Sequence, residues 1–422
     1  MIGKPKRQTV RMLQLQEYKG DMQRELGEIL SFWTRYCPDL VQGGFYGRID
    51  QCNGIHPDAP RGVVLYSRIL WTFSAAFNIQ QDPGCLQQAE RAYEYISKHF
   101  IDPQEGGVFW SVDKQGCVLE DRKQIYGLAF CVYGLSEFYQ ASKKQSALDE
   151  AIGLYRIIER HAYDKKQKGY YEAFTRDWKK IDDLRLSPKD VNEQKTMNTH
   201  LHVLEAYANL YLCWKNAGLR GQIENLLEVF AHRIIDDRTR HLNLFFDENW
   251  NLKSALVSYG HDIEAAWLLQ RAAETVGHPG WTRTMKTLAV SIADAAAEGL
   301  DCDGGLKYET DHALTDADKH WWPQAEAMVG FFNAYQLSGE EKYLHHSLRS
   351  WEFVRRYIKD RVFGEWHWGV HADHRLMEKH DKAGFWKCPY HNSRACMELI
   401  RRLEHQVSLQ AGSYPGSATS NK

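Results

Sequence analysis

The chain has 422 residues, and its 53 lysines and arginines nearly balance its 55 acidic residues, which leaves a formal net charge of -2. Because the basic residues form no long cluster, nucleic acids and anionic membranes are poor partners on electrostatic grounds. No apolar run is long enough to cross a bilayer, and no apolar segment follows the positive charges of MIGKPKRQTVRMLQ at the N-terminus. We therefore expect a cytoplasmic protein that binds neither nucleic acid nor a membrane.

Aromatic residues make up 13% of the chain, including 14 tryptophans and 22 tyrosines. Sugar rings present C–H faces that stack on aromatic rings, so this composition fits a carbohydrate site as well as a large core. The nine cysteines are scattered and form no C-x-x-C pair. They predict buried thiols in a reducing compartment rather than zinc ligands or a redox motif.

Helical periodicity dominates the chain. Apolar residues fall three and four positions apart in segments 13–35, 84–100, 147–161, 196–217, 257–277 and 318–337. Proline is scarce and lies near the edges of these segments or in loops. The elements expected are therefore helices joined by loops.

A short phrase recurs between the helices: glycine or a polar residue, then alternating aromatic or apolar residues, then a turn. It reads GGFYGRID at 43–50, GGVFWSVD at 106–113, KGYYEAFTRD at 168–177, HLNLFFDENW at 241–250, GGLKYETD at 304–311 and GEWHWGVHAD at 364–373. The alternation is typical of a short β-hairpin. The spacing of roughly 60 to 70 residues is longer than the period of most solenoids.

Each interval between hairpins holds two helices, so six hairpins imply about twelve helices. Helices that follow a hairpin carry polar and aromatic residues, whereas helices that precede one are ordinary amphipathic covers. This division predicts an all-α fold, an (α/α)6 barrel whose long, hairpin-bearing loops gather at the active-site end. We expect one catalytic domain over residues 1–408 and a disordered tail over the Ser/Gly/Pro-rich residues 409–422.

Polar residues on the first three inner helices are candidates for the site. Arg68 lies among apolar residues in YSRILWTF, where an arginine needs either a buried ion pair or a ligand, and both interpretations stay open. Tyr126 lies near the start of the second inner helix, close to the loops. In KTMNTHLHVLEAY, Asn198 and His202 share a face, whereas His200 points away from His202. This H-x-H pair on a helix is therefore not expected to chelate a metal.

The fourth and fifth inner helices pair aromatic or imidazole rings with acids. In SYGHDIEAAWLL, His261 and Glu264 are at i and i+3, so the carboxylate is expected to hydrogen-bond the imidazole and raise its basicity. Ser258 is the expected N-cap of this helix. In KHWWPQAEAM, Trp322 and Glu326 share a face. This favours a sugar platform, an indole ring on which a sugar stacks, beside an acid; the alternative is that the paired tryptophans only fill the core.

The last helix begins within GFWKCPYHNSRACMEL, where Trp386, His391 and Arg394 cluster. His391 closely follows Pro389, which suits the first turn of a helix. Because a helix N-terminus disfavours imidazolium, His391 is expected to be neutral and able to accept a proton. The chain contains no glycine-rich nucleotide motif and no G-x-S-x-G nucleophile motif.

The motifs TMNTHLHVLEAY, GHDIEAAWLL, WWPQAEA and WKCPYHNSRAC resemble those of the N-acylglucosamine 2-epimerase superfamily, most closely its cellobiose 2-epimerase branch. The resemblance runs from the GGFY near residue 43 to Leu399, and it implies an (α/α)6 barrel. It implies His261 and His391 as acid/base residues, with His202 as a third active-site histidine. It further implies that Arg68 holds the O1 and O2 oxygens and that the substrate contacts are Tyr126, Asn198, Glu264, Trp322, Glu326 and Trp386.

The expected function is a sugar 2-epimerase that interconverts the glucose and mannose configurations at the reducing end of a mono- or disaccharide, without a metal or another cofactor. A base near neutral pH, such as imidazole, would remove the C2 proton and form an enediolate. A mannose 2-epimerase for monosaccharides and an aldose–ketose isomerase are the alternatives within the superfamily. A glycoside hydrolase, which would need two carboxylates such as Glu264 and Glu326, and a non-catalytic sugar-binding protein are the alternatives outside it. We expect a monomer or a homodimer.

Overall fold

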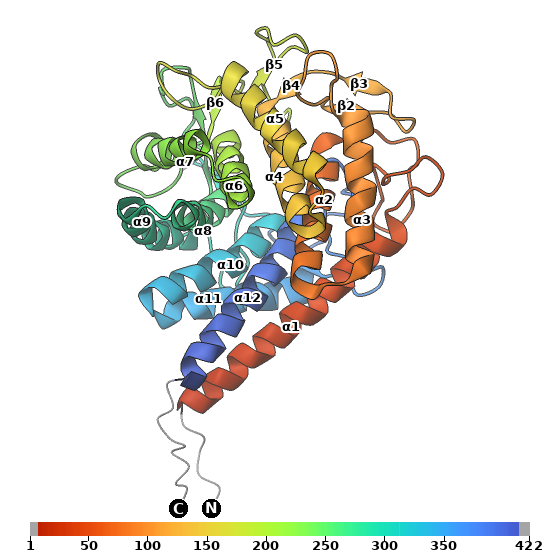
Figure 1. The fold of residues 1–422 in the computed structure, drawn as a ribbon. Coiled ribbons are helices and arrows are strands. Elements are labelled where there is room, and N and C mark those ends of the chain that lie inside the picture. Colours follow the sequence, from red (N-terminus) through yellow and green to blue (C-terminus); the bar gives the residue numbers. More distant parts are fainter. Residues whose placement is uncertain (1–6, 312, 413–422) are drawn as a thin grey trace, which may run out of the picture.

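The computed structural model describes residues 7–311 and 313–412, and the backbone of this part of the chain forms twelve α-helices in two rings (Figure 1). The inner helices are α2 (Val63–Gln80), α4 (Ile125–Ser142), α6 (Met197–Cys213), α8 (Tyr259–Val276), α10 (Trp321–Ser338) and α12 (Tyr390–Gly412). The outer helices are α1 (Arg7–Tyr36), α3 (Pro83–Tyr95), α5 (Gln145–His161), α7 (Ala217–Val229), α9 (Pro279–Ala297) and α11 (Glu341–Phe353).

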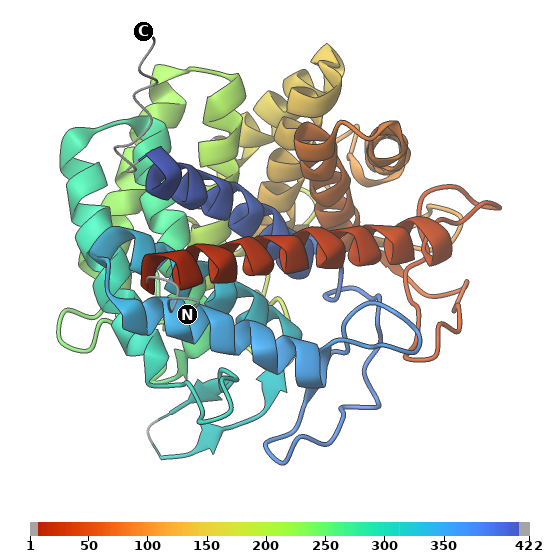
Figure 2. The same cartoon turned by 90° about the horizontal axis from the view of Figure 1, so that it is seen from below.

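The inner helices form a closed ring, because each one packs on the next and α12 packs back on α2. Their sequences explain this position: α2 is buried without interruption from Val63 to Ala76, as expected of a helix that is surrounded on every side. An outer helix such as α5 buries one stripe, with Ala147, Leu148, Ala151, Leu154, Tyr155 and Ile158. Helices α1 and α12 lie side by side in both views (Figures 1 and 2). The predicted (α/α)6 barrel is confirmed.

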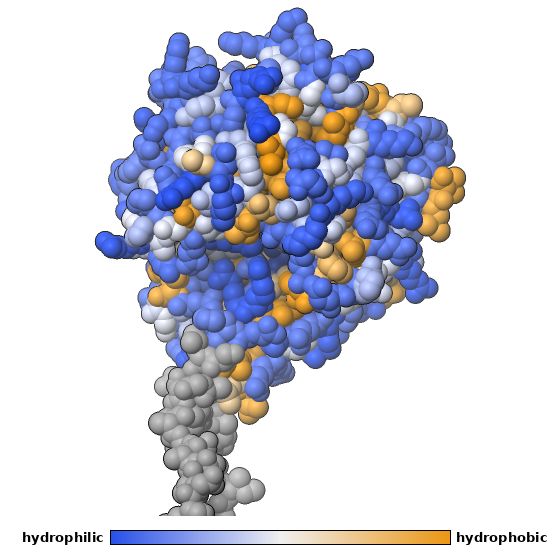
Figure 3. All heavy atoms as spheres, viewed as in Figure 1, coloured by the Kyte–Doolittle hydropathy of each residue, from blue (hydrophilic) through white to orange (hydrophobic). Residues whose placement is uncertain are grey.

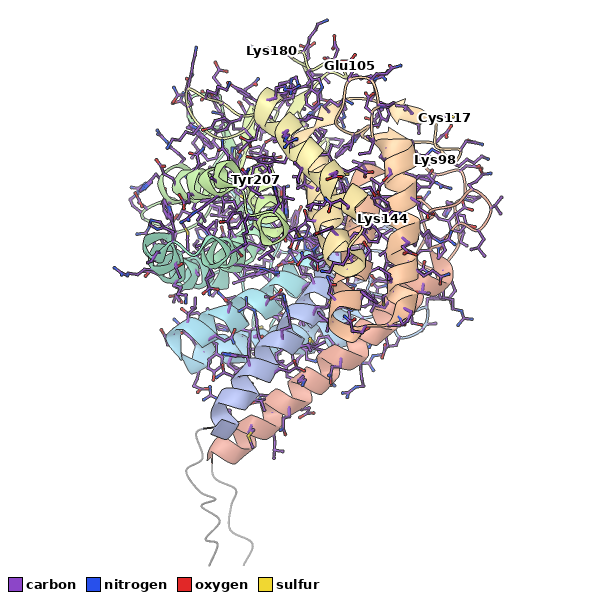
Figure 4. All side chains as sticks on the ribbon, in the orientation of Figure 1. Lys98, Glu105, Cys117, Lys144, Lys180 and Tyr207 are labelled. Atoms are coloured by element: carbon purple, nitrogen blue, oxygen red, sulfur yellow. The ribbon has the colours of Figure 1, made fainter. Side chains whose placement is uncertain are left out.

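Short strands gather at one end of the barrel, where Glu105 and Lys180 mark two of the loops (Figure 4). Most of them form five antiparallel pairs, each joining the segment before an inner helix to the hairpin of the next repeat. These pairs are β1 (Arg61–Gly62) with β2 (Ser111–Val112), β4 (Lys123–Gln124) with β5 (Ala173–Phe174), β6 (Lys195–Thr196) with β7 (Phe245–Phe246), β8 (Val257–Ser258) with β9 (Glu309–Thr310), and β11 (Lys319–His320) with β12 (Gly369–Val370). Strands β3 (Val118–Glu120) and β10 (Thr315–Asp316) extend two of these sheets.

The predicted hairpins are present, but they do not stand alone. An isolated bridge between Ile49 and Ala383 joins the first hairpin to the segment before α12 and so closes the circle of strand pairs. The first N–H of an inner helix can therefore donate to the neighbouring hairpin, as Val63 does to the Trp110 carbonyl and Met197 to the Leu244 carbonyl. This contact satisfies a group that the helix itself leaves unpaired. It also sets the first turns of the inner helices around one opening.

Buried ion pairs fasten five of the hairpins to the inner helices. In each pair a cation at most 1% exposed in its side chain, two residues before the inner helix in four repeats and eight before α12 in the sixth, meets an aspartate that lies three or four residues before the hairpin phrase. The pairs are Arg61–Asp39, Lys123–Asp102, Lys195–Asp164, Lys319–Asp301 and Lys382–Asp360. The fourth repeat departs from this pattern, with Val257 before α8 and a His241–Asp262 pair at 2.6 Å. A buried cation paired with an aspartate thus occurs in every repeat except the fourth, which carries His261.

Four further findings concern the predictions for the tail, segment 84–100, the cysteines and the membrane. Helix α12 ends at Gly412, so residues 409–412 of the predicted disordered tail are helical, while residues 413–422 lie outside the described residues. Segment 84–100 is not one helix, because α3 ends at Tyr95 and a π-helical turn covers Ile96–Phe100. All nine cysteines are free thiols, but the prediction that they are buried is wrong for Cys52, Cys117 and Cys302, which lie exposed in loops, and Cys213 is half-buried. Among the described residues no helix is long and apolar enough to span a membrane, and the face in Figure 3 is mainly hydrophilic.

We predict that Asp164→Ala lowers the free energy of unfolding by about 3–5 kcal/mol, because it leaves a buried ammonium without its carboxylate. Lys195 Nζ lies 2.8 Å from Asp164 and would keep only the carbonyls of Lys168 and Glu248. Urea unfolding followed by circular dichroism measures the change. Glu228→Ala is the matched control, since it breaks the half-exposed pair with Lys168 and should cost less than about 1 kcal/mol. Equal losses in the two variants would contradict a structural role for the buried pair.

Candidate active site

The predicted site residues converge where the inner helices begin. They come from the first two turns of these helices, except Trp386, which precedes α12. The residues are Arg68 on α2, Tyr126 on α4, Asn198 and His202 on α6, His261 and Glu264 on α8, Trp322 and Glu326 on α10, and His391 on α12. The structure therefore brings the whole predicted set to the strand end of the barrel.

A fully buried arginine, Arg394, connects the inner helices beneath this site. Its guanidinium donates to Glu205 on α6, to Glu264 on α8 and, over 2.6 Å, to Glu326 on α10. Tyr390 donates to Glu205 over 2.7 Å, which satisfies this carboxylate further. Buried charges are stable only when they are paired and hydrogen-bonded, and this cluster meets both conditions. Sequence reasoning noted Arg394 near the start of α12 but did not predict that it links four helices.

His391 is held by a carboxylate. Its Nδ1 lies 2.8 Å from Glu326, whose other oxygen accepts a hydrogen bond from the Trp267 indole at 3.0 Å. Nδ1 therefore carries the hydrogen, and Nε2 is left as the free, basic nitrogen. Burial and the nearby guanidinium groups of Arg68 and Arg394 lower the pKa of His391 well below its usual value. The expected neutral imidazole is thus present.

His261 is held by a hydroxyl group instead. The predicted bond from Glu264 to His261 is wrong: the His261 Nδ1 lies 2.8 Å from Ser258 Oγ, and Glu264 is bonded to Arg394. The physical reason is that a carboxylate gains more from a buried guanidinium than from a neutral imidazole. Burial lowers the pKa of His261 to about 3, so this ring is also neutral at physiological pH.

Trp322 lies between the two histidines. Its ring centroid is 4.7 Å from that of His261 and 5.7 Å from that of His391. The indole thus contacts both imidazoles at the same opening, as the prediction of a sugar platform requires.

Glu326 does not share this position, because its side chain is only 1% exposed and is bonded to Arg394 and His391. Glu264 is equally buried, so the structure places both carboxylates behind the histidines rather than at the opening.

Arg68 has no carboxylate partner among the described residues, which decides against the buried ion pair left open above. One nitrogen donates to the Tyr126 hydroxyl at 2.8 Å and another to the Trp386 carbonyl at 3.4 Å, while Nε has no partner. The guanidinium lies 4.2 Å from the centroid of the Phe130 ring. A buried cation with neutral neighbours attracts an anion strongly. This is the arrangement required to hold negative charge on a substrate.

His200 and His202 point in opposite directions, as predicted. His202 lies on the site side of α6, with Nδ1 3.0 Å from Glu205 and its ring 5.2 Å from that of Tyr126. His200 lies on the outer side, where its Nε2 accepts from the Tyr170 N–H at 2.8 Å and its Nδ1 bonds the Thr196 carbonyl at 2.6 Å. Tyr207 of Figure 4 is on the same outer face. His200 is therefore a structural residue.

A pocket extends from His261 toward the outside. Asn198 and Ser258 line it at the helix starts, Tyr308 lines one wall, and residues between 184 and 193 of the β5–β6 loop line another. The Oδ1 of Asn198 is buried without a hydrogen-bond partner, which makes it an acceptor available to a sugar hydroxyl. Sequence reasoning missed the loop. The signal was its length, since the third interval has more residues between hairpin and inner helix than the others.

Three of the site's groups lie close enough together to suggest a metal. Ligand atoms of Glu264, Glu326 and His391 are within 4.8 Å of one another. However, Arg394 already donates to both carboxylates, so its guanidinium supplies the positive charge that a cation would supply. The donor set of the described residues therefore fits an arginine-bridged support better than a metal centre.

The ring of helices is an (α/α)6 barrel, and two imidazoles and an indole lie together at its opening. The profile of the N-acylglucosamine 2-epimerase family matches residues 44–395, and the chain belongs to this family. The cellobiose 2-epimerase of Bacteroides fragilis is 48% identical over 387 residues, which cover 90% of this chain and 98% of that protein. The structure of cellobiose 2-epimerase from Bacillus thermoamylovorans superposes with a TM-score of 0.88 at 40% identity and covers 92% of this chain and 100% of that one.

A more distant relative is the D-mannose isomerase of Marinomonas mediterranea, 23% identical over 414 residues, which cover 91% of this chain and 98% of that protein. The family, the fold and the class of enzyme, a carbohydrate epimerase, are those predicted from the motifs. The comparisons do not assign roles to individual residues, so the roles given below are proposals.

We predict that His200→Gln makes the stability less sensitive to acid. Burial lowers the pKa of His200 to about 4, so below pH 6.5 the unfolded chain binds a proton that the folded protein does not. Stability then falls with pH by about 1.4 kcal/mol per unit, or about 2 kcal/mol between pH 7 and pH 5. Urea unfolding of His200→Gln should therefore show a smaller loss of unfolding free energy between pH 7 and pH 5 than the wild type. His232→Gln, which changes an exposed histidine, should show the same loss as the wild type. Identical pH slopes in His200→Gln and the wild type would show that the prediction is wrong.

Proposed function

We propose that the protein inverts C2 at the reducing end of a sugar by moving a proton between His261 and His391. The observation that carries the proposal is their shared position: two neutral imidazoles from different helices contact one indole, beside an arginine that has no carboxylate partner. Inversion needs a base on one face of C2 and an acid on the other. Two histidines at one opening fulfil this requirement without a redox step.

In this mechanism an open-chain aldose binds with its C2 between the two imidazoles. The free Nε2 of one histidine removes the C2 proton, and the electron pair delocalises onto the C1 carbonyl as an enediolate. The other histidine carries a proton on Nε2 when the sugar is bound and donates it to the opposite face of C2. The first histidine keeps the proton taken from C2, so the two protonation states are exchanged and the reverse reaction uses the opposite roles. The lowered pKa values keep the histidine that acts as base unprotonated at neutral pH, and the histidine that acts as acid takes up its proton from solvent before the transfer.

Arg68 would stabilise the negative charge that develops on the C1 and C2 oxygens, as the donors of an oxyanion hole do. Its bonds to a hydroxyl and a carbonyl leave its charge uncompensated until the enediolate forms. Ring opening precedes this step and needs a proton donor and an acceptor at the ring oxygen and O1. His202 or His391 would serve, since Glu205 orients the first and Glu326 the second.

The proposed substrate is a β-1,4-linked disaccharide such as cellobiose, which the 48% identical relative is named for. The reducing sugar would lie among Arg68, His202 and the two catalytic histidines. The second sugar would lie in the outer pocket, stacked on Trp386 or Trp322. The cytoplasm is the proposed location, which the nine free thiols support, and a monomer or a homodimer is the proposed state.

A glycoside hydrolase is a poorer fit to this geometry. Hydrolysis needs two carboxylates that flank the scissile bond at about 5–10 Å from each other. Glu264 and Glu326 both bond the same nitrogen of Arg394 and are 1% exposed. A substrate cannot pass between them without breaking this cluster.

We predict that His261→Ala and His391→Ala each reduce kcat for cellobiose by at least about a hundredfold, while circular dichroism shows an intact fold. Proton NMR in heavy water, which follows both the epimer ratio and the loss of the C2 proton, measures the effect. His200→Gln is the control that keeps its activity. Prior treatment with EDTA should not change the wild-type rate. If either alanine variant keeps more than a few per cent of the activity, the two-histidine assignment is wrong.

We further predict a higher kcat/KM for cellobiose than for mannose, by about five- to tenfold, because stacking of the second sugar contributes roughly 1 kcal/mol or more. Trp386→Ala should remove most of this preference. A preference for mannose would instead support a monosaccharide 2-epimerase, and accumulation of a ketose would support an aldose–ketose isomerase.

A further inference from the structure

The two proposed catalytic histidines have different partners at Nδ1. His391 bonds a carboxylate, Glu326, which is itself bonded to Arg394 and Trp267. His261 bonds only the hydroxyl of Ser258, at 2.8 Å. A carboxylate accepts and never donates when ionised, whereas a serine hydroxyl can do either. The two rings are therefore supported in chemically different ways.

Ser258 occupies the N-cap of α8, yet its side chain does not cap the helix. Serine at this position normally accepts a hydrogen bond from a backbone N–H of the first turn. Thr196, at the N-cap of α6, behaves in this way and accepts from the Thr199 N–H at 3.2 Å. Ser258 is instead directed to the imidazole three residues later. The Ser258 hydroxyl thus has a role other than capping the first turn of α8.

The surroundings of Ser258 restrict what else could orient His261. Ser258 is 3% exposed. Of the two acids in the first turns of α8, Asp262 is bonded to His241 and Glu264 to Arg394. Trp322 contacts the face of the imidazole but offers it no acceptor in this geometry. The Ser258 hydroxyl is therefore the group that determines which ring nitrogen of His261 faces the pocket.

We propose, building on the epimerase function proposed above, that Ser258 is a positioning residue that holds His261 with Nε2 toward C2 of the sugar. Its hydroxyl accepts from Nδ1–H and so presents the unprotonated Nε2 for proton removal. When His261 returns a proton instead, the same hydroxyl keeps the ring in place. Ser258 touches no reacting atom, and its effect is confined to the transfers made by His261, on one face of C2.

An effect limited to the proton transfers of His261 can be measured by isotope exchange at C2. Each epimer is incubated in heavy water with the wild type, Ser258→Ala, Ser258→Thr and the control Ser136→Ala, a buried serine on α4 whose hydroxyl bonds the Val132 carbonyl. Mass spectrometry measures deuterium at C2 of the recovered substrate relative to the product formed. Thermal unfolding verifies that each variant is folded.

In Ser258→Ala, kcat should fall by about five- to tenfold, the effect of losing one hydrogen bond in the transition state. The epimer that His391 deprotonates should show a matching rise in deuterium in the recovered substrate, because the enediolate forms normally but waits for His261. The other epimer should show a fall, because once formed its intermediate is rapidly protonated by His391. Ser258→Thr, which keeps the hydroxyl, should restore the wild-type ratios, and Ser136→Ala should retain them.

Two results would overturn the proposal, and they are distinguishable. If Ser258→Ala slows both epimers without changing either deuterium ratio, Ser258 acts only on the fold, and the epimerase function stands. If the wild type itself incorporates no deuterium at C2 of either epimer, the proposed function fails and the role of Ser258 fails with it.

Discussion

The buried guanidinium of Arg394 is the interaction on which the geometry of the site depends. It binds carboxylates from α6, α8 and α10 and so fixes three inner helices to α12. Burial raises the pKa of Glu264 and that of Glu326, while the positive charge of Arg394 opposes both shifts. Without this cation the three acids would repel one another inside the barrel. With it, the helices that carry His202, His261, Trp322 and His391 are held at one height around the opening.

Two of the buried arginines, Arg394 and Arg68, have opposite surroundings. Arg394 bonds three carboxylates, from Glu205, Glu264 and Glu326, which compensate its charge. Arg68, at the same end of the barrel, bonds only the neutral Tyr126 hydroxyl and a carbonyl. A cation without a carboxylate partner, such as Arg68, can stabilise the negative charge of an enediolate. A cation bonded to carboxylates, such as Arg394, can instead fix the carboxylate that positions a histidine. One end of the barrel thus contains one arginine whose charge is paired with carboxylates and another whose charge is not.

Similar ion pairs fasten the strand end of the barrel in five repeats, and the exception is the repeat that carries His261, one of the two proposed acid–base residues. Five repeats place a buried cation before the inner helix and pair it with an aspartate that precedes the hairpin phrase. The fourth repeat has Val257 there, followed by Ser258 and His261. Its acid, Asp262, bonds His241 instead. The start of α8 therefore differs from the other helix starts at the position where a serine supports an imidazole.

The sequence by itself determined the ring of helices and predicted which residues gather at its opening. The recurrence of GGFYGRID-like phrases and the polar residues in apolar helices depend on local periodicity, which a single chain displays directly. Residues in the first two turns of the inner helices, such as Tyr126 and His202, could be identified because one end of every inner helix faces the opening. The partners of these residues could not be identified from the chain, because they come from other helices. Local spacing paired Glu264 with His261, whereas the tertiary structure gives Glu264 to Arg394, 130 residues away, and leaves His261 to Ser258. A buried charge pair outweighs a nearby neutral contact, and only the folded barrel decides which charges meet.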